Sequence, residues 1–206
     1  YLQHRDESVQ GINAANTIVY EGTELRGYNT DYQAAMESLE NAVAQIDDGA
    51  IAGRTALVLG AGGAAKAVAY GLKKRKADVV ITSRTMENAE RLAQYLECQA
   101  IPWERRSAVK ADIIVNCTPV GMHPKVDQSP MEKNWLRPGS VVFDTVYNPE
   151  NTLLIKDAKE RSCYTVTGVD MFVRQAALQF KLFTGHDAPV EVMHETLKRA
   201  TSAVKY

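Results

Sequence analysis

The sequence predicts an α/β protein with a Rossmann-like, doubly wound parallel sheet and part of a smaller α/β substrate domain. Between residues 55 and 167, short apolar runs alternate with longer stretches in which apolar residues recur at helical spacing. This alternation favours parallel strands joined by crossover helices. A glycine-rich turn joins the first apolar run to the next helical stretch, as in nucleotide-binding βαβ units.

The chain upstream of this repeat predicts a hairpin followed by one long helix. β-Branched and aromatic residues flank Glu21-Gly22 within Thr17–Tyr28, which is typical of two paired strands. Apolar residues from Tyr32 to Ile46 recur at helical spacing, and Asp47-Asp48-Gly49 predicts the end of that helix. We assign no complete helix or strand to residues 1–13.

Within the repeat, each element follows from its local pattern. Apolar and β-branched runs predict five strands, at Thr55–Leu59, Val79–Ser83, Asp112–Cys117, Val141–Tyr147 and Cys163–Thr167. Helical spacing predicts helices at about residues 63–74, 86–96 and 151–161. A short segment, QAIPW, follows the second of these helices.

Two consecutive helices are predicted at the end of the chain, at Met171–Phe183 and Glu191–Ala203, separated by Gly185 and Pro189. This change from strand–helix alternation to consecutive helices divides the chain into three parts. They are a remnant of a substrate domain (1–48), a nucleotide-binding domain (49–168), and C-terminal helices that pack back on the substrate domain (169–206).

The composition excludes several classes of function. The chain has 206 residues, and its 24 Lys and Arg nearly balance its 25 Asp and Glu. Such a balance gives no field that would favour nucleic acid or an anionic membrane. No apolar run is long enough to cross a bilayer, and no signal-peptide pattern opens the chain. The three cysteines predict reduced thiols in the cytoplasm, and the four scattered histidines give no basis for a metal site.

The glycine-rich turn has the spacing of a dinucleotide-binding loop. In LVLGAGGAAKAV, Gly60, Gly62 and Ala65 match the pattern G-x-G-x-x-G/A between a strand and a helix. Glycines let the backbone approach a pyrophosphate, which the helix N-terminus also attracts. The residues expected to contact it are Gly60, Ala61, Gly62, Gly63 and Ala64. A plain glycine-rich turn without a ligand is the alternative.

The end of the second predicted strand favours NADP over NAD. An NAD site places an acidic residue roughly 20 positions past the glycines to bind the ribose hydroxyls. The sequence has Ser83-Arg84-Thr85 there, without a carboxylate. Arg84 can pair with a 2′-phosphate and stack on adenine, and Ser83 and Thr85 can add hydrogen bonds. A solvated surface arginine is the alternative.

Two later strands end in loops that we expect beside the nicotinamide, because ligands bind outside the carboxyl ends of parallel strands. The first loop holds Cys117, Thr118 and Pro119 in VNCTPVGM, and the second holds Val146 in VVFDTVYNP. Taken alone, Pro119 and the other prolines and glycines of these loops are better explained as turn formers.

Seven motifs together resemble the shikimate dehydrogenase family, and the resemblance covers nearly the whole chain. They are INAANTIV, GYNTD, GAGGAAKAV, SRT, VNCTPVGM, DTVYNP and GVDMFVRQA. The resemblance implies a reversible, NADP-dependent reduction of 3-dehydroshikimate to shikimate, a step in aromatic amino acid biosynthesis.

The same resemblance implies roles for individual residues. Asn16 and Gln175 resemble residues that bind the substrate, and Asp31 resembles the acid of a catalytic Lys–Asp pair. Tyr147 lies near substrate and nicotinamide in the family, and Gly168 and Met171 resemble residues that line the nicotinamide pocket.

Asp31 has two readings. Taken alone, an aspartate before an amphipathic helix is better explained as an N-cap that contributes about 1 kcal/mol. Within the motif set we interpret it as catalytic, and the two roles can coexist. An anion at a helix N-terminus should be a poor proton donor, so we expect Asp31 to orient a lysine and bind a substrate hydroxyl.

The family's catalytic lysine and its Ser-x-Ser clamp lie upstream of AANT and are not in this sequence. We therefore expect a truncated chain that binds the cofactor and turns over poorly or not at all. Some relatives are fused behind a dehydroquinate dehydratase domain, which leaves a bifunctional parent open.

One departure from the family pattern keeps a second enzyme open. Family members often carry another basic residue four positions after the arginine of the SRT motif, where this chain has Asn88. Weaker NADP selectivity would suit a quinate/shikimate dehydrogenase that uses NAD. A non-catalytic, dehydrogenase-like regulator is a further alternative, which the presence of Asn16, Asp31 and Gln175 disfavours.

Overall fold

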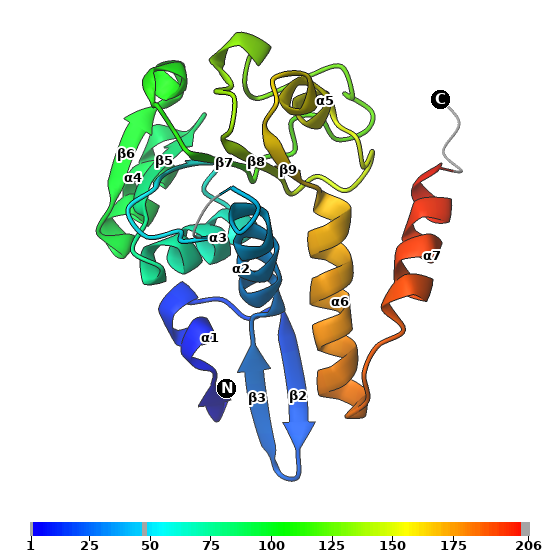
Figure 1. Ribbon diagram of the computed structural model, residues 1–206. Helices are drawn as coiled ribbons and strands as arrows, with labels where there is room; N and C mark the ends of the chain where they lie inside the picture. The colour runs from blue at the N-terminus through cyan, green and yellow to red at the C-terminus, as the bar shows by residue number, and fades with distance from the viewer. Residues whose placement is uncertain (1, 47–48, 203–206) are drawn as a thin grey trace.

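The computed structural model describes residues 2–46 and 49–202. Its centre is a six-stranded sheet in the order β6-β5-β4-β7-β8-β9, with every neighbouring pair parallel. The predicted α/β, doubly wound fold class is therefore confirmed (Figure 1). The strands are β4 (Thr55–Leu59), β5 (Asp78–Ser83), β6 (Gln99–Pro102), β7 (Ile113–Asn116), β8 (Val141–Asp144) and β9 (Tyr164–Val166).

Helices cover both faces of this sheet. On one face, apolar side chains of α2 (Thr30–Val43), α3 (Gly63–Lys74) and α4 (Met86–Leu96) form a single buried cluster with the strands. On the other face, α5 (Leu153–Glu160) packs with the 3₁₀ segments η1 (Trp103–Ala108) and η2 (Lys133–Trp135). Figure 1 shows α5 on one side of the sheet and α2 and α3 on the other. The strands are thus buried on both faces, which explains their continuous apolar runs.

The N-terminal part forms a second, three-stranded sheet in the order β1-β3-β2. Its hairpin, β2 (Thr17–Glu21) and β3 (Glu24–Tyr28), is as expected, but it turns at residues 22–23 and not at Glu21-Gly22. Two elements were missed by the sequence reading, β1 (His4–Arg5) and α1 (Glu7–Ile12). The side chain of Asp6 caps this short helix by accepting a hydrogen bond from the Ser8 amide at 2.8 Å.

Several predicted boundaries differ from the structure. Helix α2 ends at Val43, although the apolar spacing continues to Ile46, which still packs against the core. The predicted stop at Asp47-Asp48 lies outside the described residues. Strand β8 ends at Asp144 and not at Tyr147, because the Asp144 side chain already bonds the Val146 amide.

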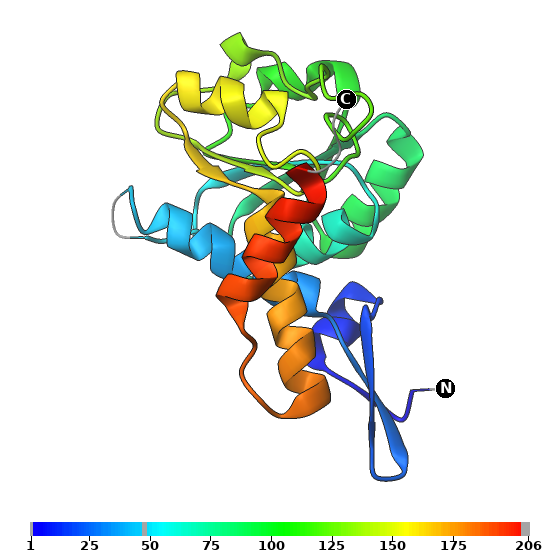
Figure 2. The ribbon, with the colours of Figure 1, turned by 90° about the vertical axis from the view of Figure 1, so that its right-hand side faces the viewer.

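The last two helices lie side by side. Helix α6 (Gly168–Thr184) packs along α2 and also touches β2, while α7 (Val190–Ser202) packs on α6 (Figure 2). Helix α6 begins three residues before the predicted Met171, because the Thr167 side chain caps it by accepting from the Asp170 amide. The predicted end of the last helix, Ala203, lies outside the described residues. None of the helices described here combines the length and apolarity that a membrane span requires.

Candidate active site

The first turn of α2 places Asp31 without using it as a cap. Asn29 is the N-cap, and its side chain accepts a hydrogen bond from the Tyr32 amide at 3.1 Å. Asp31 is therefore the second residue of the helix, and the predicted capping role is wrong. The physical reason is local: Asn29 has the extended backbone that an N-cap requires, so the helix begins at Thr30 and Asp31 already lies inside its first turn.

A hydrogen-bonded chain of side chains joins three elements beside Asp31. Asn16 precedes β2; its amide nitrogen donates to Thr30 Oγ1 at 3.0 Å, and its Oδ1 accepts from the Thr30 amide at 2.9 Å. From α6, Gln179 donates to Thr17 Oγ1 at 3.0 Å, and the Thr30 hydroxyl reaches Gln175 Oε1 at 3.5 Å. The hairpin, the start of α2 and the middle of α6 are thereby held together.

A cavity of ≈ 340 Å³ lies between these side chains and the sheet. It is lined by Asn16, Asp31, Ala64, Thr145, Tyr147, Gly168, Met171, Phe172, Gln175 and Gln179. All four residues that the sequence reading assigned to substrate line it, together with the two assigned to the nicotinamide pocket and one from the glycine loop. We refer to this cavity as the Asp31 pocket.

Three lining side chains were not singled out from the sequence: Thr145, Phe172 and Gln179. The Phe172 ring lies 4.8 Å from that of Tyr147, and both rings are partly exposed at the pocket. Gln179 is one helical turn after Gln175 on α6, so the two amides share a face. That four-residue spacing was a signal in the sequence that could have found Gln179.

Burial changes the chemistry of Asp31. Desolvation raises the pKa of its carboxyl, and a hydrogen bond from Asn16 offsets this in part. Burial thus acts against the stabilisation of the anion that we expect from the helix N-terminus. Across residues 2–46 and 49–202, no lysine or arginine forms an ion pair with Asp31.

The glycine loop has the geometry that a pyrophosphate requires. Gly60 has φ +115°, and a Cβ there would lie 3.0 Å from the carbonyl oxygen of Cys117. Gly62 is the N-cap of α3 without a side-chain cap bond, and a Cβ at Gly62 or Gly63 would meet nothing within 4 Å. The first amides of α3 thus face open space, and Ala65, which is fully buried, holds the helix close to the sheet. These residues fit a dinucleotide phosphate.

The end of β5 carries the predicted cofactor-selecting residues on the surface. Arg84 and Thr85 are exposed, and the Thr85 amide donates to Ser83 Oγ at 3.3 Å. A separate cavity of ≈ 380 Å³ runs between α3 and α4, and its lining includes Ala61, Lys66, Asn88, Arg91 and Tyr95. Arg84 does not line it. Arg91 donates to the Asn88 side chain, so a guanidinium that the sequence reading missed lies beside Asn88.

The loop after β8 is bonded to the end of β7, and the four predicted cofactor residues of the two loops do not line the Asp31 pocket. Cys117 is half-buried, and burial raises the pKa of its thiol, with the nearby Asp144 charge acting in the same direction. Thr118 is half-buried and Pro119 exposed, while Val146 is buried under the start of α6. A Cβ on Gly168 would lie 2.2 Å from the Val146 carbonyl oxygen, so only glycine allows this contact.

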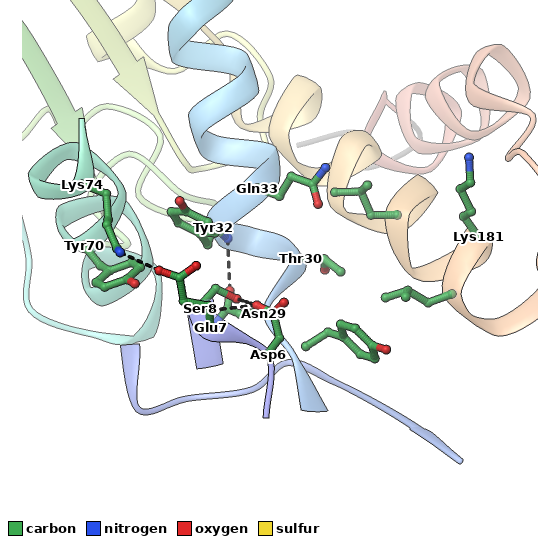
Figure 3. A pocket seen from close by; sticks show the side chains of 13 residues that line it. Asp6, Glu7, Ser8, Asn29, Thr30, Tyr32, Gln33, Tyr70, Lys74 and Lys181 are labelled. Carbon is green, nitrogen blue, oxygen red and sulfur yellow. Dashed lines mark hydrogen bonds and ion pairs between the residues drawn. The ribbon is translucent and has the colours of Figure 1, made fainter. Parts of the chain in front are cut away.

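A larger cavity lies elsewhere, at ≈ 660 Å³. Figure 3 shows it between the N-terminal segment, the first turn of α2, α3 and α6, with Lys74 and Lys181 on opposite walls. Its charged groups already have partners: Lys74 binds Glu7 at 2.6 Å, Lys181 binds Asp187 at 2.9 Å, and Asp6 caps α1. We refer to it as the Lys74 pocket.

Two family models match separate parts of the chain. Residues 168–198 match the shikimate 5′-dehydrogenase C-terminal domain, which covers α6 and most of α7. Residues 55–147 match the family described as NADP oxidoreductase, coenzyme F420-dependent, which covers the sheet from β4 to β8.

Curated relatives cover almost the whole chain. The shikimate dehydrogenase (NADP(+)) of Moorella thermoacetica is 41% identical over 98% of this chain and 71% of its own length. The bifunctional 3-dehydroquinate dehydratase/shikimate dehydrogenase of Arabidopsis thaliana is 36% identical over 94% of this chain and 34% of its own length.

Solved structures share the fold. Shikimate 5-dehydrogenase of Thermus thermophilus, in complex with NADP(H) and shikimate, aligns with a TM-score of 0.83 at 34% identity, over 97% of this chain and 73% of that one. Quinate dehydrogenase of Corynebacterium glutamicum, in complex with NAD, aligns with a TM-score of 0.85 at 29% identity, over 95% and 71%. By sequence and by structure, the chain belongs to the shikimate dehydrogenase family.

Proposed function

We propose that this chain serves the NADP-dependent, reversible reduction of 3-dehydroshikimate to shikimate. The observation that carries the proposal is the Asp31 pocket, where Asn16, Asp31, Tyr147 and Gln175 converge from four separate segments. The pocket also contains Ala64 of the glycine loop, so a cofactor on that loop would reach it. Family membership supports the same reaction.

Each residue has a role that follows from the chemistry of its side chain or backbone. NADPH, when bound, supplies the hydride for the ketone carbon. The glycine loop and the first amides of α3 hold the pyrophosphate, and Arg84 pairs with the 2′-phosphate. Asn16 and Gln175 offer amide groups to the hydroxyls of the substrate, and Tyr147 with Phe172 closes one side of the pocket.

The ketone oxygen must take up a proton as the carbon receives the hydride. Asp31 binds a substrate hydroxyl at the pocket wall, and its raised pKa makes it a better proton donor than a solvated aspartate. A cation beside the oxygen would stabilise its developing charge, and no such cation pairs with Asp31 in the described residues. We therefore expect the 206-residue chain to bind cofactor and to turn over poorly or not at all.

The domain division is part of the proposal. Residues 49–168 form the NADP-binding domain, and residues 169–206 return to residues 1–48, supported by the packing of α6 on α2 and β2. Helix α2 also shares a buried cluster with the sheet, so it forms the wall between the two parts. A cytoplasmic location and a dehydratase domain fused to the parent protein complete the proposal; the Arabidopsis relative has that combination.

A direct test titrates the purified chain with NADPH and follows the nicotinamide fluorescence, and then adds shikimate to the NADP-loaded chain. We expect saturable binding of both ligands at the Asp31 pocket. Turnover is read at 340 nm with shikimate and NADP⁺. Absence of NADPH binding by the folded chain would refute the proposal, and robust turnover would refute only the expected impairment.

A quinate/shikimate dehydrogenase that uses NAD is the second candidate. Two observations favour it: the neutral Asn88 four positions after Arg84 in the sequence, and the structural match to a quinate dehydrogenase with NAD. Parallel titrations with NADH and NADPH, and with quinate and shikimate, separate the two candidates. Our proposal requires tighter binding of NADPH and of shikimate.

A further inference from the structure

Asp144, the last residue of β8, is a fully buried carboxylate outside the Asp31 pocket. Both of its oxygens are hydrogen-bonded. Oδ1 accepts from Asn116 Nδ2 at 2.9 Å and from the Val146 amide at 3.0 Å, and Oδ2 accepts from the Thr152 hydroxyl at 2.6 Å. One side chain thus connects the end of β7, the loop after β8 and the N-cap of α5.

These partners extend the network along both loops. Asn116, which is also fully buried, accepts at Oδ1 from the Thr118 amide at 3.0 Å and from the Thr118 hydroxyl at 2.7 Å. Its Nδ2 donates as well to the Val120 carbonyl at 3.2 Å. The Thr145 amide and hydroxyl both donate to the Asn116 carbonyl, at 3.0 and 2.8 Å. The two loops therefore behave as one bonded unit with Asp144 at its centre.

This unit forms one wall of the Asp31 pocket. Thr145 and Tyr147 line the pocket, and the intervening Val146 carbonyl supports Gly168, the first residue of α6. Helix α6 carries Gln175, so the position of Val146 sets the position of a substrate residue relative to the loop that holds Thr118.

The buried negative charge of Asp144 lowers the stability of the fold. Burial raises its pKa to about 6, although the bonds from Thr152, Val146 and Asn116 counteract part of that effect. The titratable group that faces it is the Cys117 thiol, whose own pKa burial raises, and no cation among the described residues pairs with the carboxylate. An asparagine could keep the bonds at Oδ1 without the charge, but its amide nitrogen cannot accept the bond that Oδ2 accepts from the Thr152 hydroxyl. A buried charge kept at the expense of stability is typical of functional sites.

We propose that Asp144 is a positioning residue: its anionic carboxylate clamps the loop 116–121 to the loop 144–152 and so aligns the nicotinamide end of the cofactor with the Asp31 pocket. The inference rests on the proposed function. Bonds to a carboxylate are about twice as strong as bonds to a neutral amide, so asparagine keeps the shape and loosens the clamp. The end of β5, where Arg84 lies, is three strands away, about 14 Å, so the adenosine half of the cofactor should be unaffected.

The test uses the 206-residue chain with three substitutions and two probes. Asp144→Asn removes the charge, Asp144→Ala removes the clamp, and Asp78→Asn makes the same chemical change at an exposed position at the opposite end of the sheet. NADPH reports on both halves of the cofactor, whereas 2′,5′-ADP reports on the adenosine half alone. Thermal unfolding is measured beside each titration.

We expect Asp144→Asn to raise the Kd for NADPH at least fivefold and Asp144→Ala at least twentyfold, with the Kd for 2′,5′-ADP unchanged within twofold in both. At pH 7.5 the Tm of Asp144→Asn should be above that of the wild type, since its folded-state pKa lies above the unfolded value and ionisation therefore destabilises the fold. That gain should vanish below pH 4, where wild-type Asp144 is protonated. Asp78→Asn should change nothing.

A merely structural role predicts that Asp144→Asn binds NADPH as tightly as the wild type, and that result would overturn the inference. Equal weakening of NADPH and 2′,5′-ADP would overturn it too. If Asp144→Ala fails to fold, Asp144→Asn decides alone, because it keeps the size of the side chain and the bonds at Oδ1. A wild-type chain that binds neither probe would instead refute the proposed function.

Discussion

The Asp31 pocket and the Lys74 pocket share the first turn of α2 and differ in what their polar groups do. The Lys74 pocket is nearly twice as large, at ≈ 660 against ≈ 340 Å³, and it contains more charge. Its charged groups already have partners, as in the pair of Lys74 with Glu7. In the Asp31 pocket, a half-buried carboxylate lacks a cation within the described chain, and amide side chains from two other segments line the same cavity.

This difference teaches that volume does not identify a site. Surface ion pairs between exposed side chains contribute little energy and mark little chemistry. A carboxyl whose pKa is raised by burial, in a cavity beside a glycine loop, has the features of a functional group. Adjacent residues of α2 face different sides because the helix turns by 100° per residue, so Asp31 and Gln33 line different pockets.

A substitution of Asp31 is the most direct test of the difference between the two pockets. We expect Asp31→Asn to weaken shikimate binding to the NADP-loaded chain by roughly 100-fold, since a charged acceptor for a buried hydroxyl is lost. The fold should not be destabilised, because the neutral amide avoids the desolvation that raises the Asp31 pKa. Calorimetric titration measures the affinity. Glu7→Gln in the Lys74 pocket is the matched control and should leave it unchanged; similar losses in both variants would contradict the distinction.

Gly168→Ala tests the contact between the start of α6 and the loop after β8. Gly168 lines the Asp31 pocket but not the Lys74 pocket. The added Cβ would lie 2.2 Å from the Val146 carbonyl oxygen, so the start of α6 must shift, at a cost of roughly 1–3 kcal/mol in the free energy of unfolding. Urea denaturation measures this cost. Gly63→Ala, where a Cβ meets nothing within 4 Å, should cost far less. Equal stability of the two variants would mean that α6 does not rest on the loop after β8.

A substitution of Arg84 tests the predicted contact with the cofactor. Loss of an exposed, charge-assisted contact with the 2′-phosphate should weaken NADPH about tenfold in Arg84→Ala and leave NADH unchanged. Arg91→Ala, measured in parallel, reports whether the guanidinium beside Asn88 shares the task. Fluorescence titration gives both constants. A loss of NADH affinity equal to the loss for NADPH would argue against a 2′-phosphate contact.

The affinity for shikimate should change a few-fold with pH as Asp31 titrates. The ionised carboxylate accepts the hydroxyl more strongly than the protonated acid does, so affinity should fall as the pH falls through its pKa. Because burial raises that pKa, the decline should begin above the pH expected for an exposed aspartate. Stability changes in the opposite sense, since a raised carboxyl pKa disfavours the folded state at higher pH. Asp31→Asn should show neither trend.

The smallest effect is expected at the ion pair of the larger pocket. The Lys74 and Glu7 side chains are about half and four-fifths exposed, so solvent screens their pair and it should contribute little to stability. Lys74→Met should therefore lower the Tm by a few degrees at most and leave the binding of NADPH and shikimate unchanged. A tenfold loss of either affinity would make the Lys74 pocket part of the site.

Local patterns predicted most of the scaffold, and the family resemblance predicted most of the pocket residues. The buried strands, the helices between them and the glycine loop each depend on residues that are neighbours in the chain, so periodicity and turn chemistry suffice. Boundaries failed where a side chain from a few residues away intervened: Thr167 starts α6 before Met171, and Asp144 ends β8 before Tyr147. The short elements β1 and α1 were missed because six residues carry too little periodicity.

Some features of the site could likewise be predicted from the sequence, and others could not. The sequence by itself determined the fold class and the family, and it predicted NADP as the cofactor and Asn16, Asp31, Tyr147 and Gln175 as site residues. Only the tertiary structure decided that Asn29, and not Asp31, caps α2, and that burial raises the Asp31 pKa. It also placed Gln179 and Phe172 in the pocket and Asp144 at the centre of two loops. Desolvation and long-range hydrogen bonds depend on residues distant in the chain, and no local pattern records them.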